Sequence, residues 1–425
     1  MPLDATIIST GEELVQGRIA DTNAAFVASL LSRNGFEVRR IVALGDDPAA
    51  LEAEIERGLD EVELVIVSGG LGPTADDRTR GAIARTVGRE LVEDGETRQH
   101  VEERLRSFHH DATPDQLTQC HFPEGARIFP NPRGTARGFA CCTDRGWVVA
   151  MPGVPPEMRS MFTGSVLPFL MEELAPAGAV SMETVHVFPA SESRVDQRIR
   201  DLTVQGRNPA VGITVSDGVI TVSVRGRAES QEEADRLVER DLEELRERFG
   251  DLVYGTGQTT LAGALSKELE RTGRTVAVAE SITGGLIGNM LVDVPGISRF
   301  FLLDVVAYSN EAKVSQLGVP PEVIEREGAV SEPVAEAMAR GACRAGEADL
   351  GISTTGIAGP TGGTPQKPVG LVYVGLCLDG RALARKLNLR GDRWRIKDRA
   401  ARHALNMARL ALTKGMNSDA INPTM

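Results

Sequence analysis

Cysteine, histidine and long apolar runs are scarce in this sequence, and each scarcity excludes a class of protein. The 425 residues include five cysteines and six histidines. The cysteines are odd in number, scattered and without CxxC spacing, which fits neither a disulfide framework nor a zinc site and favours buried, reduced thiols. No apolar run approaches the roughly 20 residues that cross a bilayer. Residues 1–6 also lack the basic and apolar regions of a signal peptide. We therefore expect a soluble, cytoplasmic protein.

Positive charge is also in short supply. Lys and Arg number 47 against 60 Asp and Glu, which gives a formal net charge of −13. Such a chain is repelled by nucleic acids and by anionic membranes, although a local basic patch can still hold one phosphate. The composition therefore predicts no nucleic-acid partner and no membrane partner.

The length indicates two or three domains, at a typical size of about 100–200 residues each. Residues 1–171 alternate short apolar strands with amphipathic helices, which predicts a parallel sheet covered on both faces. Residues 172–255 form a small acidic α+β unit with 10 Arg, no Lys and 17 Asp or Glu. Residues 256–425 return to strand–helix alternation. The predicted fold class is therefore two layered α/β domains joined by a small α+β domain.

In the last segment, the apolar pattern places a loop after each of several strands. We expect strands at Val276–Ala279, Phe301–Tyr308, Leu350–Ser353 and Leu371–Leu376. In open α/β sheets, ligands bind at the carboxyl ends of the strands. Three of these loops carry polar chemistry and are candidates for one shared site.

The first loop is Ala279-Glu280-Ser281-Ile282-Thr283-Gly284-Gly285, between a strand and a helix. Free backbone N–H groups at a helix start can stabilise an oxyanion or hold a phosphate, and Ser281 would lie beside them. The alternative is that Ser281 or Thr283 merely caps the helix. This loop alone does not decide between the two.

The second loop, Tyr308-Ser309-Asn310-Glu311-Ala312-Lys313, follows the next strand. Asn310 is a plausible N-cap, which would place Lys313 in the first helical turn. The helix dipole disfavours a cation there and would lower the pKa of Lys313, as suits a base. A solvated surface lysine is the alternative.

The third loop runs from Thr354 to Gly363 and on to Lys367. Its glycines permit close backbone approach to a ligand, and Lys367 would add a point charge for a phosphate. No histidine lies in any of the three loops. A serine–lysine pair is therefore the combination of nucleophile and base that these loops offer.

The strings AESITGG, YSNEAK, GAVSEPVAEAMA and TTGIAGPTGGTPQKPVGLVYVG resemble the CinA C-terminal family, the nicotinamide mononucleotide deamidases also called PncC. The resemblance implies conversion of nicotinamide mononucleotide to nicotinate mononucleotide and ammonia, without a cofactor, by a homodimer. It makes Ser281 the catalytic serine, with Tyr308 and Lys313 as its supporting pair. Ile282 departs from members that carry cysteine there. Expected substrate contacts are Glu280, Thr283, Gly284, Gly285, Thr355, Gly356, Gly359, Gly362, Gly363 and Lys367.

The N-terminal segment carries a second candidate site in three strings. These are Ser9–Leu14, the glycine-rich turn Ser68–Asp77, and Met151–Met158. Backbone N–H groups of the turn can cradle a phosphate, and Asp76 or Asp77 can hold a hard cation such as Mg²⁺. The alternative is a tight turn in which one of these acids caps a helix. The expected site residues are Thr10, Glu12, Gly69, Gly70, Gly72, Thr74, Asp76, Asp77 and Gly153.

The strings IISTGEEL, VSGGLGPTADD, NPRGTARGF and MPGVPPEM resemble the molybdopterin-binding fold at the N-terminus of CinA proteins. In some relatives this domain is associated with ADP-ribose pyrophosphatase activity. Arg137 and the string Phe188–Ser193 depart from the family pattern. The sequence therefore predicts an amidohydrolase acting on small nucleotides. The alternatives are a metal-dependent nucleotide pyrophosphatase, or a non-enzymatic regulator linked to competence or DNA damage.

Overall fold

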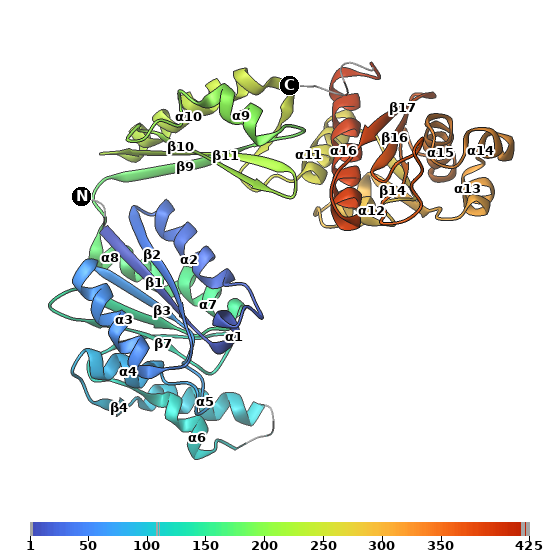
Figure 1. Cartoon of the computed structure of the whole chain (residues 1–425). Coiled ribbons are helices and arrows are strands. Elements are labelled where there is room, and N and C mark those ends of the chain that lie inside the picture. The colour runs from blue at the N-terminus through green and yellow to red at the C-terminus, as the bar shows by residue number, and fades with distance from the viewer. Residues whose placement is uncertain (1–2, 108, 110, 418–420, 422–425) are drawn as a thin grey trace. The chain divides into compact units, whose positions relative to one another are not determined.

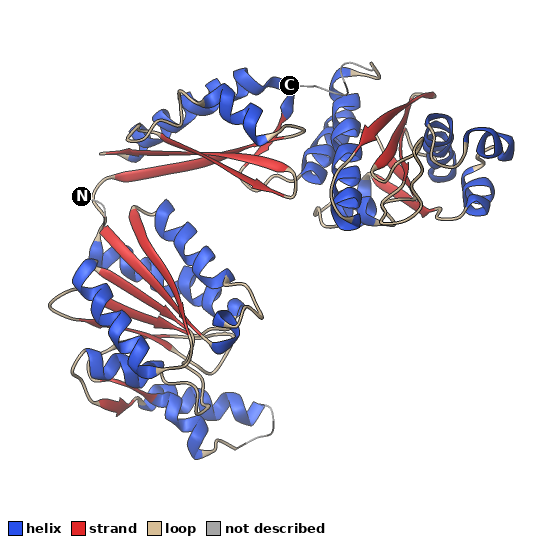
Figure 2. Cartoon of the chain, viewed as in Figure 1, coloured by secondary structure: helices blue, strands red, loops and turns tan. Residues whose placement is uncertain are grey.

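The computed structural model describes residues 3–107, 109, 111–417 and 421. The chain divides into two compact units, Met1–Ser181 with Arg227–Asp235, and Met182–Gly226 with Arg236–Met425. Figures 1 and 2 show the elements of each unit. Within the described residues, no helix is long and apolar enough to span a membrane.

The first unit is built on a six-stranded sheet in the order β2-β1-β3-β8-β7-β6. The strands β2, β1, β3 and β8 are parallel to one another, as predicted. Strand β7 is antiparallel to both of its neighbours, β8 and β6, so the sheet is mixed, which corrects the expectation of a parallel sheet. A tight turn explains the reversal: Thr143 N donates to Gly146 O at 2.8 Å between β7 and β8, and so short a connection joins only antiparallel neighbours. The strands are β1 Leu3–Thr10, β2 Phe36–Leu44, β3 Leu64–Ser68, β6 Arg127–Phe129, β7 Gly138–Cys142 and β8 Trp147–Met151.

Helices cover both faces of this sheet (Figure 1). One core forms beneath α2 and the helical stretch α7–η2–α8, and the other beneath α3 and α4. Adjacent residues of β1 show the alternation, because Ile7 belongs to the first core and Ile8 to the second. The helices are α2 Thr22–Arg33, α3 Pro48–Glu61, α4 Thr79–Thr86, α7 Pro155–Met161, η2 Phe162–Val166 and α8 Leu167–Leu174. Smaller elements are α1 Glu12–Val15, β4 Leu91–Glu93, α5 Gly95–Ser107, α6 Pro114–Leu117, η1 Thr118–Cys120 and β5 His121–Pro123.

The middle domain is a four-stranded sheet, β10-β11-β9-β12, with two helices packed against it. This confirms the small α+β fold and adds two strands, β10 and β12, and one helix, α9, that the sequence reading missed. The elements are β9 Ala179–Val187, α9 Glu192–Ile199, β10 Ala210–Ser216, β11 Val219–Ala228, α10 Gln231–Phe249, η3 Gly250–Leu252 and β12 Val253–Thr256.

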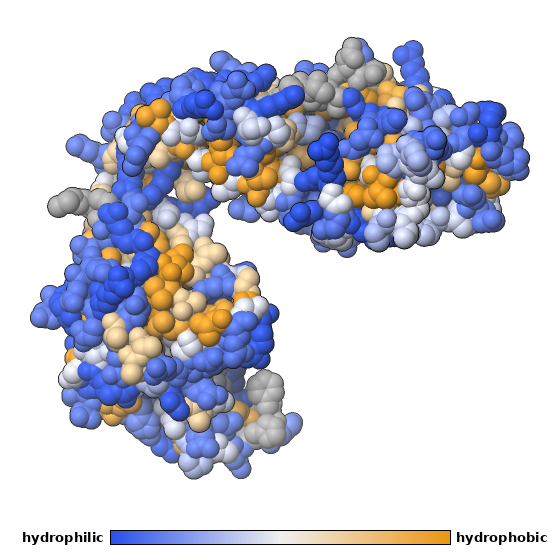
Figure 3. Space-filling model, in the orientation of Figure 1, coloured by the Kyte–Doolittle hydropathy of each residue, from blue (hydrophilic) through white to orange (hydrophobic). Residues whose placement is uncertain are grey.

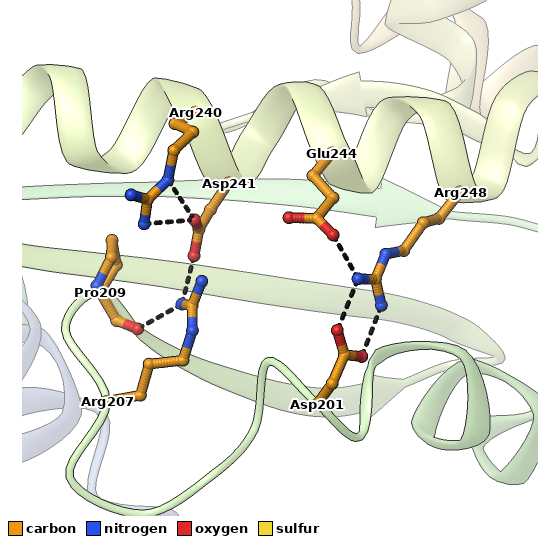
Figure 4. Close-up of polar contacts among 7 residues, drawn as sticks. All are labelled: Asp201, Arg207, Pro209, Arg240, Asp241, Glu244 and Arg248. Carbon is orange, nitrogen blue, oxygen red and sulfur yellow. Dashed lines mark hydrogen bonds and ion pairs between the residues drawn. The ribbon is translucent and has the colours of Figure 1, made fainter.

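Ion pairs neutralise several arginines of this middle domain (Figure 4). The carboxylate of Asp241 is fully buried and pairs with Arg207. Arg248 donates two hydrogen bonds to Asp201, both at 2.6 Å, and holds the pKa of that carboxyl down to about 2. These guanidinium groups are therefore engaged within the domain.

The C-terminal domain contains a five-stranded sheet in the order β14-β13-β15-β16-β17. Strands β14, β13 and β15 are parallel to one another, whereas β16 is antiparallel to both of its neighbours, β15 and β17. The sequence reading missed β17, a charged edge strand, because charged residues on sheet edges hide the apolar alternation. The strands are β13 Val276–Glu280, β14 Phe301–Val306, β15 Leu350–Gly356, β16 Leu371–Leu378 and β17 Arg381–Asn388.

Two helical layers enclose the C-terminal sheet. The larger core lies beneath α11, α12 and α16, and the smaller beneath α13, α14 and α15. The helices are α11 Leu261–Thr272, α12 Leu286–Val292, η4 Ile297–Arg299, α13 Asn310–Leu317, α14 Pro321–Glu327, α15 Glu332–Gly346 and α16 Arg393–Lys414. Figure 3 shows one face of the whole chain, and most of that face is hydrophilic, with smaller apolar patches.

The five cysteines are free thiols with unequal exposure. Cys120, Cys141 and Cys377 are buried, as predicted. Cys142 is exposed and Cys343 is half-buried, so the expectation of buried thiols is wrong for Cys142. Cys142 is the last residue of β7, at the start of the tight turn.

Candidate active sites

Ser281 lies where strand β13 ends in the C-terminal domain. Its backbone N–H donates to Thr354 O at 3.0 Å, so the loop begins by continuing the pairing with β15. The chain then turns through Gly284 and Gly285, whose positive φ angles of 63° and 93° favour glycine. Ser281 remains 8% exposed. Its hydroxyl is therefore held rigidly, near the surface of the domain.

Lys313 projects from α13 onto that hydroxyl. Lys313 Nζ lies 3.0 Å from Ser281 Oγ, 2.9 Å from Ala307 O and 3.4 Å from Tyr308 O. The side chain is 2% exposed, and burial lowers the pKa of its amine. A neutral amine could donate to the two carbonyls and present its lone pair to Ser281. This geometry suits a base next to a nucleophile.

The cause of the lysine's lowered pKa differs from the expected one. The N-cap of α13 is Ser309, whose side chain accepts from Ala312 N, and not Asn310. Lys313 therefore lies one residue deeper in the helix, where the influence of the terminal N–H groups fades. Burial is the cause of the shift.

The phenol of Tyr308 lies away from Ser281, which it was expected to support together with Lys313. It lies in the loop after β14, which ends at Val306 and not at Tyr308 as predicted. Its side chain is 65% exposed, and its hydroxyl accepts from Arg393 at 3.2 Å. Only its backbone oxygen contacts Lys313. The structure therefore does not bring the phenol between Ser281 and Lys313.

Glu280 lies beneath the loop and not among its ligand-facing groups. The side chain is fully buried. Oε2 accepts from Gly285 N and Oε1 from Gly288 N, both at 2.8 Å. These bonds use both carboxylate oxygens and the N–H of Gly285, so the expected substrate contact by Glu280 is not supported.

The third loop is held by its own polar contacts. Thr354 and Thr283 share a hydroxyl hydrogen bond of 2.7 Å, and Thr355 donates to Ala329 O at 2.8 Å. A Cβ added to Gly356 would lie 2.8 Å from Ile282 Cδ1, so this glycine is required for packing against the serine loop. Gly284 and Gly356 thus lie in adjoining loops, as predicted.

Other glycines of the third loop shape the loop itself. A Cβ on Gly359 would lie 2.6 Å from Val369 Cγ1, and one on Gly363 would lie 2.9 Å from Val369 N. Gly362 has a φ of 87°. These positions make the loop compact.

Lys367 is tied to the protein backbone. Its Nζ donates to Glu327 O at 2.6 Å and to Val330 O at 2.8 Å. Two of the three donors of the ammonium are thus engaged next to the end of α14. This contact fastens the glycine-rich loop and weakens the case for Lys367 as the phosphate ligand.

Helix α16 supplies two cations that the sequence reading did not select. Arg393 NH1 donates to Gly359 O at 2.8 Å, and NH2 donates to Tyr308 OH, so this residue links the second and third loops. Lys397 Nζ lies 3.8 Å from the position of a Cβ on Gly284. The basic start of α16 was the available signal, but sequence alone does not bring it to loops that precede it by more than 30 residues.

The N-terminal domain has a separate cavity of about 590 Å³. Of the residues expected at this site, Glu12 and Thr74 do not line the cavity. The remainder do: Thr10, Gly69, Gly70, Gly72, Asp76, Asp77 and Gly153. Asn23, Asp46 and Glu157 also line it and were not predicted.

Arg80 and Thr79 hold the glycine-rich turn of this cavity. Arg80 is 5% exposed and donates to Leu71 O at 2.6 Å and Gly72 O at 2.8 Å. Burial lowers its pKa to about 10. Thr79 Oγ1 donates to Gly69 O at 2.9 Å. The turn is thereby fixed from behind, with its other side toward the cavity.

Unsatisfied polar atoms mark the cavity as a binding site. Among the described residues, Ser9 Oγ, Thr10 Oγ1 and Asn23 Oδ1 are buried without a hydrogen-bond partner. Buried polar groups are normally paired, so such atoms are expected to receive partners from a ligand or water. All three residues line the cavity.

Acidic side chains lie at the mouth of the same cavity. Burial, and then the nearby Glu12, Glu13 and Asp76, raise the pKa of Asp46. Asp77 Oδ2 accepts from Thr74 N at 2.8 Å and from Thr74 Oγ1 at 2.6 Å, so it is already engaged. Over the described residues, no three His, Cys, Asp or Glu side chains group as a metal site. Mg²⁺ held mainly by substrate phosphates needs only one or two carboxylates, which Asp46 and Asp76 could supply.

Comparisons with known proteins match all three domains. Residues 6–172 match a probable molybdopterin binding domain, residues 182–255 the damage-inducible protein CinA KH domain, and residues 258–412 the CinA C-terminal domain. The fold and sites thus define a three-domain protein, with a molybdopterin-binding-type domain joined through a KH domain to a CinA C-terminal domain. The chain belongs to the CinA family.

Relatives match along nearly their whole length. A CinA-like protein of Dictyoglomus thermophilum is 38% identical over 96% of this chain and 98% of its own. A putative competence-damage inducible protein of Halothermothrix orenii is 40% identical over 92% and 94%. The crystal structure of the protein CinA with unknown function from Thermoplasma acidophilum is 33% identical, covers 39% of this chain and 98% of its own, and has a TM-score of 0.37. The resemblance found in the sequence is thus confirmed at the level of the family, and these names state no enzyme activity.

Proposed function

We propose that the C-terminal domain hydrolyses the amide of nicotinamide mononucleotide to nicotinate mononucleotide and ammonia. The observation that carries the proposal is the 3.0 Å contact between the buried Lys313 amine and the Ser281 hydroxyl. An amide is a poor electrophile, so its hydrolysis needs an activated nucleophile. A buried amine with a lowered pKa is a suitable base for that task.

In the proposed reaction, Lys313 takes the proton of Ser281, or of a water beside it, as oxygen attacks the amide carbon. The oxyanion would be received by backbone N–H groups of residues 282–284, because those of Ser281, Gly285 and Gly288 already have partners. As the carbon–nitrogen bond breaks, protonated Lys313 returns the proton to the leaving nitrogen, which departs as ammonia. If Ser281 is the nucleophile, Lys313 then activates the water that hydrolyses the resulting ester.

Arg393 and Lys397 provide a place for the phosphate of the substrate. Both come from the start of α16 and lie next to the loops that surround Ser281. Arginine suits phosphate recognition because its planar fork can donate two parallel hydrogen bonds. The nucleotide would then lie with its phosphate toward α16 and its amide toward Ser281, which commits the site to a small phosphorylated substrate.

A second activity, metal-dependent cleavage of the pyrophosphate of ADP-ribose, is favoured by the N-terminal cavity. Its volume of about 590 Å³ suits a nucleotide-sized ligand. The unpartnered Ser9, Thr10 and Asn23 offer hydrogen bonds, and Asp46 with Asp76 could hold a divalent cation bridged to phosphate. This candidate concerns a separate domain and does not compete with the deamidase.

One pair of assays tests both candidates on the purified full chain. Ammonia is measured with nicotinamide mononucleotide, with and without a chelator, and AMP is measured with ADP-ribose plus Mg²⁺. We expect ammonia release that the chelator leaves unchanged and that Ser281→Ala abolishes. Absence of ammonia release from the folded wild-type chain would refute the deamidase. Light scattering on the same sample tests the proposed homodimer.

A further inference from the structure

Two carboxyl groups, the buried Glu280 and the half-buried Asp304, lie directly beneath the serine loop. Glu280 is the last residue of β13, and Asp304 lies on the neighbouring strand β14, where it is paired in register with Val278. The two carboxyls are in hydrogen-bond contact. Among the described residues, Asp304 Oδ1 is buried without a hydrogen-bond partner. Two carboxylates cannot both be charged in such contact at low cost, so the pair shares a proton.

The contacts of Glu280 identify which partner holds the proton. Both of its oxygens accept backbone N–H groups, from Gly285 and Gly288, at 2.8 Å. Such bonds favour the charged form of a carboxyl group. Asp304 Oδ1 has no such donor among the described residues, so we assign the shared proton to Asp304. Burial, and then the charge of Glu280, raise the pKa of Asp304 to about 7.

The helix α12 is shaped around this pair. Its N-cap, Gly285, has no side chain to cap the helix, and the carboxylate of Glu280 takes that part. A Cβ on Gly288 would collide with Asp304 Oδ2, so the glycine leaves room for the second carboxyl. The pair thus joins both ends of the turn that carries Ser281.

We propose that Asp304 is a positioning residue for the amide hydrolysis, because its proton, shared with Glu280, fixes the turn that presents Ser281 to Lys313. The inference rests on the proposed function. Asp304 touches neither Ser281 nor Lys313 and acts through Glu280. Loss of its proton would place a second negative charge against Glu280 and weaken the acceptor that holds Gly285 and Gly288.

Glu280 is the charged group that faces Asp304. It does so from β13, and α12 presents the backbone of Gly288. Leu303 and Val305 of β14 pack in the core beneath α13, α14 and α15, so Asp304 points to the other face of the sheet and the charged residues of α15 lie away from it. Arg299 of η4 pairs with Glu270, and Lys397 of α16 lies beside Gly284. Glu280 is therefore the group that sets the titration of Asp304.

The pH dependence follows from the direction of the shift. The folded-state pKa of Asp304 lies above its ordinary value of 3.8. The contribution of the neutral pair is therefore fully present below about pH 4 and is lost as pH rises through about 7. Ammonia release should accordingly fall on the alkaline side, by up to tenfold per pH unit, while Lys313 sets the acidic side.

The test is the pH–rate profile of Asp304→Asn, which keeps a hydrogen-bond donor of the same shape but cannot ionise. We expect this variant to retain activity near wild-type at pH 6 and to lose the alkaline fall. Asp293→Asn, which removes an exposed carboxylate from the end of α12, is the matched control and should keep the wild-type profile. An Asp304→Asn profile that falls above pH 7 as the wild type does would overturn the proposal.

A measurement without substrate separates this inference from the proposed function. Amide hydrogen exchange in the segment 281–288 of the wild-type chain should accelerate above pH 7 by more than the intrinsic tenfold per unit. Asp304→Asn should remove the excess. Excess exchange with no ammonia release at any pH would leave the carboxyl pair standing and sink the deamidase. Ammonia release without excess exchange would sink the role of Asp304.

Discussion

Replacement of Lys313 by arginine is the sharpest test of the catalytic pair. Lys313 Nζ contacts Ser281 Oγ and two backbone carbonyls, and the amine is buried. A guanidinium can donate to the same acceptors, but it stays protonated throughout the working pH range. Lys313→Arg therefore makes the charge permanent and removes the base. Lys313→Met is the companion variant, with similar length and neither charge nor lone-pair nitrogen.

The expected loss can be given a magnitude. General-base catalysis contributes about 10²- to 10⁴-fold to turnover. At about 1.4 kcal/mol per tenfold, that is about 3–6 kcal/mol of transition-state stabilisation. Lys313→Arg and Lys313→Met should lose kcat by the same factor. The double variant with Ser281→Ala should be no worse than Ser281→Ala alone, because the two residues act as a unit.

The assay is steady-state ammonia release from nicotinamide mononucleotide, with kcat and KM determined separately across pH. The wild type should show an ascending limb set by Lys313, at a pH below the ordinary lysine pKa of 10.5, since burial lowers that pKa. Lys267→Arg, on the exposed side of α11, is the matched control and should behave as the wild type. Near-wild-type kcat in Lys313→Arg would refute the base and reassign this lysine to substrate binding.

Three further outcomes are expected. Ser281→Ala should reduce ammonia release at least 10²-fold with little change in melting temperature, and substantial residual turnover would remove the serine from the mechanism. Asp76→Asn combined with Asp77→Asn should abolish any Mg²⁺-dependent release of AMP from ADP-ribose and leave deamidation intact; equal loss of both activities would indicate misfolding. Tyr308→Phe should raise KM several-fold with kcat nearly unchanged, because its hydroxyl contacts Arg393 and not Lys313; a hundredfold fall in kcat would restore a relay role.

Much of the order of elements in the two α/β domains, and the loops of both candidate sites, could be predicted from the sequence. Apolar runs fixed β13, β14 and β15 to within a few residues, and polar strings directly after them indicated the candidate loops. The carboxyl ends of parallel neighbours lie at one sheet edge, so Ser281 and Lys313 were expected to meet. The structure brings them to 3.0 Å. Local pattern and a general rule of sheet topology were sufficient there.

The roles of individual side chains needed the tertiary structure. Glu280, Tyr308 and Lys367 stand in the three loop strings that indicated the site, yet their contacts are with backbone N–H groups, with Arg393 and with backbone carbonyls. A string gives the position of a residue along the chain but not the direction of its side chain. Which atoms it meets depends on residues distant in sequence, such as Arg393, 85 positions beyond Tyr308.

The protonation of the buried groups was decided in the same way. The sequence placed an acid beside Ser281 and a lysine in the next loop, but it did not determine whether Glu280 would stabilise the charge of Lys313. In the fold, Glu280 faces Asp304 and two N–H groups, and Lys313 is left in a buried setting where its pKa falls. Desolvation and the distance between charges are properties of packed side chains. The sequence therefore determined which residues form the site, and only the tertiary structure decided which of them carries a proton.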